Sequence, residues 1–237
     1  MITAVILAAG QGKRMGKEIP KQFLMVQDKP IIIYTLESFQ THPFIDAIEV
    51  VCCKNWIEQM QEYAQQYNIH KLKLIVPGGA SSQESIRNGI FALEEYMKDE
   101  DMVIIHDGIR PLVDDDVLTN VIDVCKEFGN GVSSLPYNEQ IFVTEDAKSS
   151  VKYIPRGTLR RVSTPQAYLF GLIDHAYRVA EASGIGFGDS SYANTMMADL
   201  GYRLYFAKGS DRNIKLTTQV DLEVFQAYLQ MERKGQQ

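Results

Sequence analysis

Short apolar runs rich in β-branched residues alternate with longer segments of helical spacing along the first half of the chain. The apolar runs, which predict buried strands, are residues 3–9, 47–53, 72–76 and 102–106. The segments with helical spacing are residues 31–41, 55–67, 81–97 and 114–128. This alternation predicts βαβ units and a Rossmann-like α/β fold, with a mostly parallel sheet flanked by helices. Ligands of such sheets bind beyond the carboxyl ends of the strands.

Two of these helices have a residue at their start that commonly caps a helix. Asn55 is the expected N-cap of the helix at 55–67. Ser81 and Glu84 have the spacing of a capping box at the start of the helix at 81–97. We therefore expect the side chains of Asn55 and Ser81 to accept hydrogen bonds from backbone amides of the first helical turn.

The pattern changes between residues 132 and 168, where an alternating segment turns at EDAKSS. This predicts a long hairpin, a β-arm at about residues 135–160 that is inserted into the α/β fold. Because an isolated hairpin is only marginally stable in water, we expect the arm to pack against another chain. The remaining expected elements are helices at 171–182 and 190–200, a strand at 202–209 and a final helix from about 219. With no linker and no second core, residues 1–237 are expected to form one domain.

The composition limits the classes of partner. The 237 residues carry a formal net charge of −6, which argues against a general nucleic-acid-binding protein. No apolar run approaches the length of a membrane span and no charged leader precedes the first strand, so we expect a cytoplasmic protein. The cysteines Cys52, Cys53 and Cys125 are odd in number and include an adjacent pair, so no disulfide framework is expected. Core packing is expected for Cys52 and Cys53.

The glycine-rich stretch LAAGQGKRMG at 7–16 directly follows the first expected strand. Its glycines are spaced G-x-G-x-x-x-G, which matches neither the dinucleotide fingerprint nor the P-loop and argues against an NAD-dependent oxidoreductase. The loop contains Lys13 and Arg14, and Lys21 follows in PKQF. Cations beside free backbone amides suit a triphosphate, whereas a solvated basic turn is the structural alternative.

Five motifs occur in the order, and at about the spacing, of a known enzyme family: LAAGQGKRMG, PKQF, HDGIRP, TPQAY and NIKLTT. From residue 2 to about residue 225 the chain resembles the 2-C-methyl-D-erythritol 4-phosphate cytidylyltransferases and their relatives, the ribitol-5-phosphate cytidylyltransferases. The resemblance implies a nucleotidyltransferase-type fold and a homodimer in which the arms complete the partner's acceptor pocket. It also implies that the phosphate of a polyol phosphate attacks the α-phosphate of CTP, which yields a CDP-polyol and pyrophosphate.

This implied reaction requires charge neutralisation, because two anions must meet. A phosphate monoester is mostly dianionic near neutral pH, its second pKa being about 6, so the nucleophile needs no general base. Positioning and electrostatic stabilisation account for most of the catalysis of phosphoryl transfer. The resemblance implies that the catalytic cations are Arg14, Lys21 and Lys215, the last of which lies in NIKLTT.

The remaining site residues follow from the same resemblance, at positions that match the family motifs. Those expected to contact CTP are Ala8, Ala9, Gly10, Gly12, Lys13, Gly79, Ser85 and Gly108. Those expected to face the acceptor are Arg110, Gln140 and Arg156. Asp107, at the end of an apolar strand, is the expected ligand of Mg²⁺ or another divalent cation. For Lys13 a contact with the β- and γ-phosphates and exposure to solvent both stay open, and His106 is expected to be structural.

Several positions depart from the family pattern. Ala80 and Ser82 stand where an acidic residue and an arginine are common, so backbone amides are expected to read the edge of the base. Gln140 stands where the methylerythritol enzymes have a threonine. Arg212 replaces an aspartate that the ribitol-type relatives also lack, whereas ILAAG is closer to the methylerythritol type.

Two questions therefore stay open. The acceptor is 2-C-methyl-D-erythritol 4-phosphate or an alditol phosphate such as ribitol 5-phosphate, which decides between isoprenoid biosynthesis and cell-surface polyols. The alternative to an active enzyme is a catalytically weakened, nucleotide-binding regulatory or scaffold homologue. The retained Arg14, Lys21, Asp107 and Lys215 favour the enzyme, because binding alone does not require so many converging cations.

Overall fold

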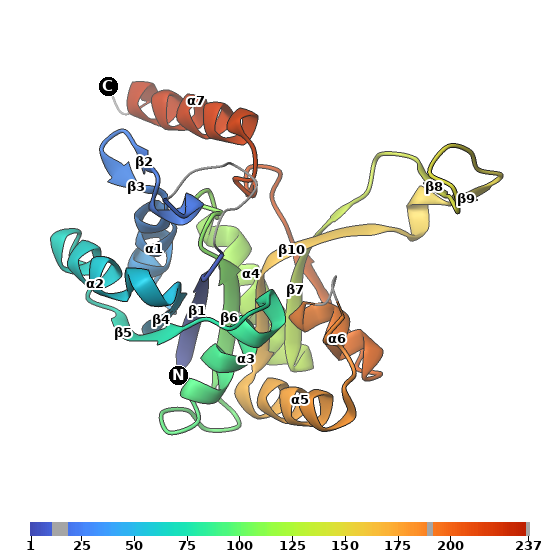
Figure 1. Cartoon of the computed structure of the whole chain (residues 1–237), viewed down its shortest axis with the longest axis horizontal. Helices are drawn as coiled ribbons and strands as arrows, with labels where there is room; N and C mark the ends of the chain where they lie inside the picture. The colour runs from blue at the N-terminus through green and yellow to red at the C-terminus, as the bar shows by residue number, and fades with distance from the viewer. Residues whose placement is uncertain (11–18, 189–191, 236–237) are drawn as a thin grey trace.

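The structure is a computed structural model that describes residues 1–10, 19–188 and 192–235 (Figure 1). Seven strands of the described residues form one sheet in the order β11-β7-β10-β6-β1-β4-β5. Their bounds are β1 Ile2–Ala8, β4 Ala47–Cys52, β5 Leu72–Pro77, β6 Met102–Asp107, β7 Asn130–Pro136, β10 Arg160–Leu169 and β11 Phe206–Lys208. Neighbouring strands run parallel except at β10, which is antiparallel to both β6 and β7. The predicted mostly parallel, Rossmann-like sheet is confirmed.

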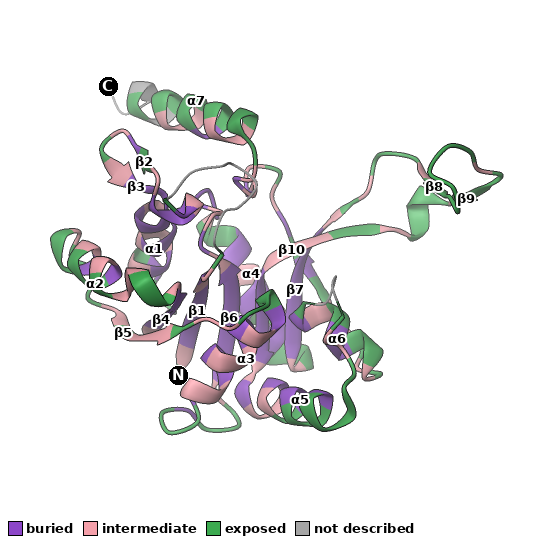
Figure 2. Cartoon of the chain, viewed as in Figure 1, coloured by how far each residue is buried: buried purple, intermediate pink, exposed green. Residues whose placement is uncertain are grey.

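Helices cover both faces of this sheet (Figure 1). One face carries α1 (Ile31–Thr41), α2 (Ile57–Gln66) and α4 (Asp115–Phe128). The other face carries α3 (Ser82–Ala92), α5 (Phe170–Ser183) and α6 (Ala193–Asp199). Successive strand residues point to opposite faces, so Ile6 belongs to the first core and Val5 to the second. Because both faces are covered, the central strands are buried and nearly continuously apolar (Figure 2).

The last helix, α7 (Gln219–Gly235), lies beside the small hairpin of β2 (Met25–Val26) and β3 (Lys29–Pro30) instead of on the sheet (Figure 1). Its Phe225 is fully buried in a separate apolar cluster with Val26 and Leu216. This packing anchors the C-terminal segment near the carboxyl ends of the central strands. No helix in the described part of the chain is long and apolar enough to cross a membrane.

The start of α2 differs from the prediction. Residues Lys54–Trp56 form a 3₁₀ turn, η3, and α2 begins after Trp56 with no side-chain cap. The expectation that Asn55 caps this helix is therefore wrong. Trp56 stacks on the buried Phe23 with ring centroids 4.6 Å apart, and this contact fixes the turn in place of a cap.

The start of α3 agrees with the prediction in one of its two bonds. The Ser81 hydroxyl accepts a hydrogen bond from the Glu84 amide at 3.1 Å, as expected for the N-cap. The Glu84 carboxylate, however, accepts from the Ala80 amide at 2.7 Å and so holds the loop that precedes the helix. The helix ends at Ala92, earlier than the predicted Met97. Met97 is nevertheless buried, so the apolar spacing continues past the end of the helix.

The strand β11 is also shorter than the predicted span of 202–209. Before it, the Asn130 side chain donates to the Arg203 carbonyl at 3.0 Å and accepts from the Tyr205 amide at 3.0 Å. The Asn130 carboxamide therefore makes the bonds to Arg203 and Tyr205 beside a backbone bond, in which the Val132 amide donates to the Tyr205 carbonyl at 2.8 Å.

The predicted arm is present and projects away from the sheet (Figure 1). Beyond β7 and β10, the strands β8 (Ile141–Val143) and β9 (Lys152–Ile154) pair antiparallel. The arm is largely exposed (Figure 2), and its apolar side chains are exposed too: Phe142 at 55%, Val151 at 97% and Tyr153 at 69%. The short hairpin thus carries exposed apolar side chains, and the expectation that it packs against a second chain stays a prediction.

Candidate active site

The carboxyl ends of four parallel strands lie in one row. The strand register pairs Ala8 with Cys52, Cys52 with Pro77, and Leu7 with Asp107. The glycine loop, the loop after β5 and the HDGIRP segment therefore leave the sheet side by side, as predicted. This row is where a doubly wound sheet binds its ligands.

Asp107 lies at the centre of a polar cluster at the end of β6. Its Oδ2 accepts from Arg110 Nε at 2.8 Å, and its Oδ1 accepts from Lys215 Nζ at 3.2 Å. The Thr164 hydroxyl accepts from the Asp107 amide at 3.1 Å. The side chains of Asp107 and Arg110 are each 15% exposed, and that of Lys215 is 33% exposed. The structure thus joins HDGIRP, TPQAY and NIKLTT, which are far apart in the sequence.

The charges of this cluster fix the protonation state of Asp107. Burial favours the neutral carboxyl, but the ammonium of Lys215 and the guanidinium of Arg110 outweigh it and hold the pKa of Asp107 below its ordinary value. The carboxylate is therefore ionised at neutral pH. The neighbouring His106 is fully buried, and burial lowers its pKa to about 4. Its ring pairs with the Arg110 carbonyl at 3.1 Å, in agreement with the expected structural role.

Lys21 contacts the segment before α7 that also carries Lys215. Lys21 Nζ donates to the Thr217 carbonyl at 2.5 Å, two residues after Lys215. Asp221, in the first turn of α7, accepts from the amides of Thr217 and Thr218 at 2.7 and 2.6 Å. The start of α7 therefore fixes the backbone at Thr217 and Thr218, which follows Lys215 and accepts the bond from Lys21.

A cavity of about 290 Å³ opens beside Asp107. The polar residues that line it are Asp107, Arg110, Ser163, Thr164, Gln166, Tyr192, Asn194 and Lys215. Lys215 Nζ lies 5.9 Å from the centre of the Tyr192 ring. Sequence reasoning did not assign roles to Thr164, Tyr192 or Asn194; only Thr164, which lies in TPQAY, had a motif that could have indicated it.

A second cavity of about 440 Å³ opens at the ends of β1, β4 and β5. Its lining residues are Ala9, Pro20, Cys52, Cys53, Lys54, Asn55, Trp56, Gly78 and Gly79. The structure thus places Ala9 and Gly79, two of the expected CTP contacts, at one cavity. It adds the turn η3, which no motif indicated.

The backbone amides of the loop after β5 are already bonded within the protein. The amide of Gly78 donates to the Cys52 carbonyl at 2.8 Å, and that of Gly79 donates to the Ser85 hydroxyl at 3.1 Å. The Ala80 amide bonds to Glu84, as described above. These three amides donate within the protein, and the expectation that backbone amides read the edge of the base stays a prediction. Ser85 is only 5% exposed and holds the loop through this bond.

The start of the glycine loop is held by Gln22, from the PKQF motif. Its Nε2 donates to the carbonyls of Ala8 at 2.5 Å and Gly10 at 3.1 Å. Cys53 Sγ lies 3.5 Å from the same Ala8 carbonyl, so this thiol belongs to the loop contacts and not to the core interior that was expected. Three further expected residues, Gly12, Lys13 and Arg14, lie outside the described residues.

Gly108 follows Asp107 and has a packing reason to lack a side chain. An added Cβ would lie 2.6 Å from Ile32 Cδ1 and 2.9 Å from the Leu7 carbonyl oxygen. Any larger residue would therefore push β6 away from α1.

The two arm residues expected at the acceptor do not join the Asp107 cluster within one chain. Gln140 and Arg156 line a separate cavity of about 420 Å³ on the arm. Arg156 donates to the Asn138 carbonyl at 3.4 Å. The arm points away from the end of β6 (Figure 1), so the expectation that these side chains face the acceptor is not met within one chain.

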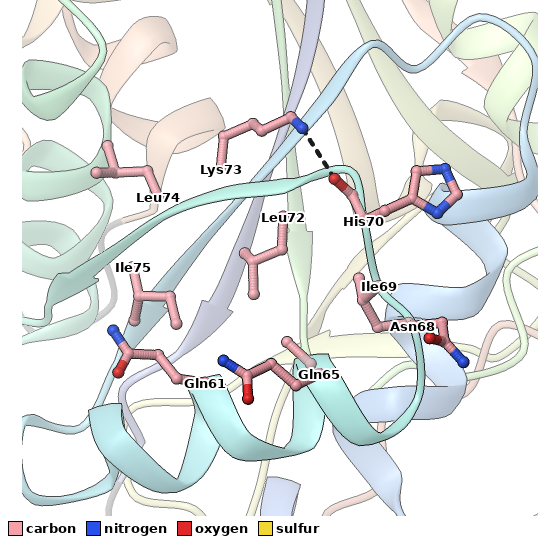
Figure 3. Close-up of a pocket in the computed structure, with 10 residues that line it drawn as sticks. Gln61, Gln65, Asn68, Ile69, His70, Leu72, Lys73, Leu74 and Ile75 are labelled. Atoms are coloured by element: carbon pink, nitrogen blue, oxygen red, sulfur yellow. Dashed lines mark hydrogen bonds between the residues drawn. The ribbon is translucent and has the colours of Figure 1, made fainter.

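A further cavity of about 590 Å³ lies between α2 and the edge strand β5 (Figure 3). Gln61 and Gln65 point into it from α2, opposite Leu72 and Ile75. Its lysine, Lys73, donates to the His70 carbonyl at 2.9 Å. This cavity has no carboxylate in its lining and lies away from the row of strand ends.

The described residues contain no group of three or more metal-binding side chains of His, Cys, Asp or Glu. Asp107 is the carboxylate that lines the 290 Å³ cavity. Mg²⁺ is commonly held by one or two carboxylates together with the phosphates of a substrate. The residues present therefore fit a cation that is bound jointly with a nucleotide, and do not fit a closed protein cage.

Comparison with known proteins gives the same family over nearly the whole chain. The family profile described as IspD, 2-C-methyl-D-erythritol 4-phosphate cytidylyltransferase, matches residues 2–231. The ribitol-5-phosphate cytidylyltransferase of Lacticaseibacillus paracasei is 58% identical over 97% of this chain and 98% of that protein. The 2-C-methyl-D-erythritol 4-phosphate cytidylyltransferase of Clostridium acetobutylicum is 37% identical over 94% of each chain.

A solved structure shares the fold. The crystal structure of 4-diphosphocytidyl-2C-methyl-D-erythritol synthase from Anaerococcus prevotii matches with a TM-score of 0.82 at 23% identity, over 97% of this chain and 96% of that chain. Together with the motifs joined at Asp107, these matches identify the chain as a member of the 2-C-methyl-D-erythritol 4-phosphate cytidylyltransferase (IspD) family of nucleotidyltransferases.

Proposed function

We propose that the protein is a cytidylyltransferase whose acceptor is ribitol 5-phosphate. The observation that carries this choice is the 58% identity to the Lacticaseibacillus paracasei enzyme named for ribitol 5-phosphate, against 37% to the Clostridium acetobutylicum enzyme named for the methylerythritol substrate. Arg212 supports it, because the ribitol-type relatives also lack the aspartate expected there. Gln140 is compatible with it, because a carboxamide can bond an additional hydroxyl.

The row of strand ends accommodates both substrates. The 440 Å³ cavity at β1, β4 and β5 takes the nucleoside, and the 290 Å³ cavity beside Asp107 takes the acceptor. Neighbouring strands lie about 4.8 Å apart, so β4 and β6 are separated by about 10 Å. We therefore expect the triphosphate to lie over the end of β1, where the glycine loop begins.

The chemistry follows from the charges. An oxygen of the acceptor phosphate attacks the α-phosphorus of CTP, and the bond to the bridging oxygen breaks, so pyrophosphate leaves. Lys21 and Lys215 neutralise the phosphate oxygens as the two anions meet, while Arg110 holds Asp107 in position. Mg²⁺ bound at Asp107 and the phosphates would further neutralise the charge that develops in the transition state.

We further propose a homodimer in which Gln140 and Arg156 of the partner subunit complete the acceptor cavity. The exposed apolar side chains of the arm, above all Val151 and Tyr153, support contact with a second chain. A twofold axis would give both arms the same environment.

The proposal is tested by pyrophosphate release with four nucleoside triphosphates against ribitol 5-phosphate, 2-C-methyl-D-erythritol 4-phosphate and glycerol 3-phosphate. We expect the highest kcat/KM with CTP and ribitol 5-phosphate. A higher kcat/KM with the methylerythritol substrate would mean that this substrate, and not ribitol 5-phosphate, is the acceptor. The proposed cytidylyl transfer would still stand. CTP binding without pyrophosphate release on any acceptor would favour the scaffold alternative.

A further inference from the structure

Gln83, in the first turn of α3, is a buried polar side chain to which the proposed reaction gives no role. It is only 2% exposed. Its Nε2 donates to the Gly186 carbonyl at 2.9 Å, and its Oε1 accepts from the Tyr177 hydroxyl at 2.8 Å. Because a carbonyl oxygen can only accept, the nitrogen faces Gly186 and the orientation of the carboxamide is fixed. One side chain thus joins α3 to α5 and to the segment after α5.

The segment after α5 packs directly against α6. Gly186 has a φ of +78°, and a Cβ added to it would lie 2.5 Å from Met196 Cγ. Met196 is fully buried, and its amide donates to the Tyr192 carbonyl at 2.9 Å. Any displacement of Gly186 toward α6 would therefore displace Met196 and the first turn of this helix.

The first turn of α6 forms one wall of the cavity beside Asp107. Tyr192, the N-cap of α6, and Asn194 line this 290 Å³ cavity. Ile86 lines the same cavity from α3, one helical turn after Gln83. The cavity thus lies between two helices that the bonds of Gln83 connect through α5 and Gly186.

We propose that Gln83 is a positioning residue for the acceptor; this rests on the proposed function. Its two hydrogen bonds hold α6 in register with α3, so that the wall formed by Tyr192 and Asn194 keeps its place beside Asp107. Apolar contacts alone tolerate small shifts, whereas buried hydrogen bonds restrict both distance and direction. The effect is specific to the acceptor, because among the described residues none of α5 or α6 lines the 440 Å³ nucleotide cavity.

The test compares Gln83→Met and Tyr177→Phe with Ile90→Val as a matched control. Methionine has nearly the shape of glutamine but leaves both partners of Gln83 unbonded, whereas Tyr177→Phe removes one bond and keeps the other. Ile90→Val shortens a fully buried side chain of α3 that lines neither cavity, so it controls for lost packing alone. The KM for the preferred acceptor, the KM for CTP and kcat are measured, and thermal unfolding checks that each variant is folded.

We expect Gln83→Met to raise the KM for the acceptor about 5- to 10-fold, in line with the loss of a buried neutral hydrogen bond, and to leave the KM for CTP within about twofold. The fall in kcat should be smaller than the rise in KM, because Lys215 keeps its own contacts. Tyr177→Phe should raise the KM for the acceptor about 2- to 3-fold, because the second bond of Gln83 remains. Ile90→Val should leave both KM values unchanged.

An unchanged KM for the acceptor in folded Gln83→Met, or an equal rise in both KM values, would overturn the inference while the wild-type activity upholds the proposed function. If Gln83→Met does not fold, an unchanged KM for the acceptor in Tyr177→Phe overturns the inference instead. A wild-type chain that turns over CTP with no polyol phosphate would overturn both.

Discussion

At the end of the sheet, Asp107 is 15% exposed and contacts Arg110, Lys215 and Thr164, which come from three different segments. On the arm, Gln140 and Arg156 are exposed, and Arg156 reaches the Asn138 carbonyl only at 3.4 Å. The body of the chain holds its site residues in place by itself. The arm presents side chains with few contacts of their own, which is the reason for proposing that a second chain packs against it.

The largest effect should come from breaking the charge balance of the body. Lys21→Ala or Lys215→Ala should lower kcat about 10²-fold or more, because each removes a cation that stabilises the transition state. CTP binding should fall less than kcat. Steady-state kinetics and calorimetry measure the two quantities.

The matched control for these lysines is Lys126→Ala, an exposed lysine that pairs with Asp123 on α4. It should leave kcat unchanged. Near-normal kcat for Lys21→Ala or Lys215→Ala would remove that lysine from the catalytic group.

A smaller effect is expected at the carboxylate that the body holds ionised. Asp107→Asn should raise the Mg²⁺ concentration for half-maximal activity about 30-fold, because a neutral amide is a poorer ligand for a hard cation. Activity is measured across a Mg²⁺ titration, with Asp123→Asn as an exposed control. Full wild-type activity in excess chelator would contradict the metal assignment.

The body also contains a fully buried carboxyl side chain, whereas the arm contains none. Glu49 is fully buried on β4, and neither carboxyl oxygen has a hydrogen-bond partner. Burial raises the pKa of Glu49 from an ordinary 4.5 to about 9. Between these values the folded protein keeps a proton that the unfolded chain has lost, so rising pH lowers the free energy of unfolding.

We expect a contribution of about 1.4 kcal/mol per pH unit from this group, a tenfold change in the folding equilibrium. Glu49→Gln should remove that slope in urea unfolding between pH 5 and 8. Glu145→Gln, at the exposed arm tip, is the control and should leave the slope unchanged. An unchanged slope in Glu49→Gln would show that Glu49 is ionised in the folded protein.

The same comparison of body and arm shows which features the sequence could predict. The βαβ alternation was enough for β1, β4, β5 and β6, and the motifs were enough to bring Asp107 and Lys215 together, because strand ends in a parallel sheet meet at one edge. The sheet strands β7 and β10 were not predicted, because residues 132–168 were interpreted as a hairpin alone. Asn55 was misassigned, because a cap motif is local and the stacking of Trp56 on Phe23 is a tertiary contact. No local pattern could indicate that Glu49 is buried without a partner.

The smallest effect should come from a single uncharged arm residue. Gln140→Ala should raise the KM for the acceptor about 3- to 5-fold, as expected for one neutral hydrogen bond, and leave the KM for CTP unchanged. Initial rates at varied acceptor and varied CTP separate the two. A selective rise in the KM for CTP would place Gln140 at the nucleotide and contradict the division between body and arm.

Subunit mixing tests this division most directly. Arg156→Ala and Lys21→Ala homodimers should each be nearly inactive. The first lacks the arm cation expected at the acceptor, and the second lacks a catalytic lysine of the body. In a mixed dimer both defects should fall on one site and leave the other intact. Activity should return to about one quarter of wild type, since half the dimers mix statistically and each keeps one of two sites. Mixed dimers that form but stay inactive would mean that each chain builds its acceptor site alone.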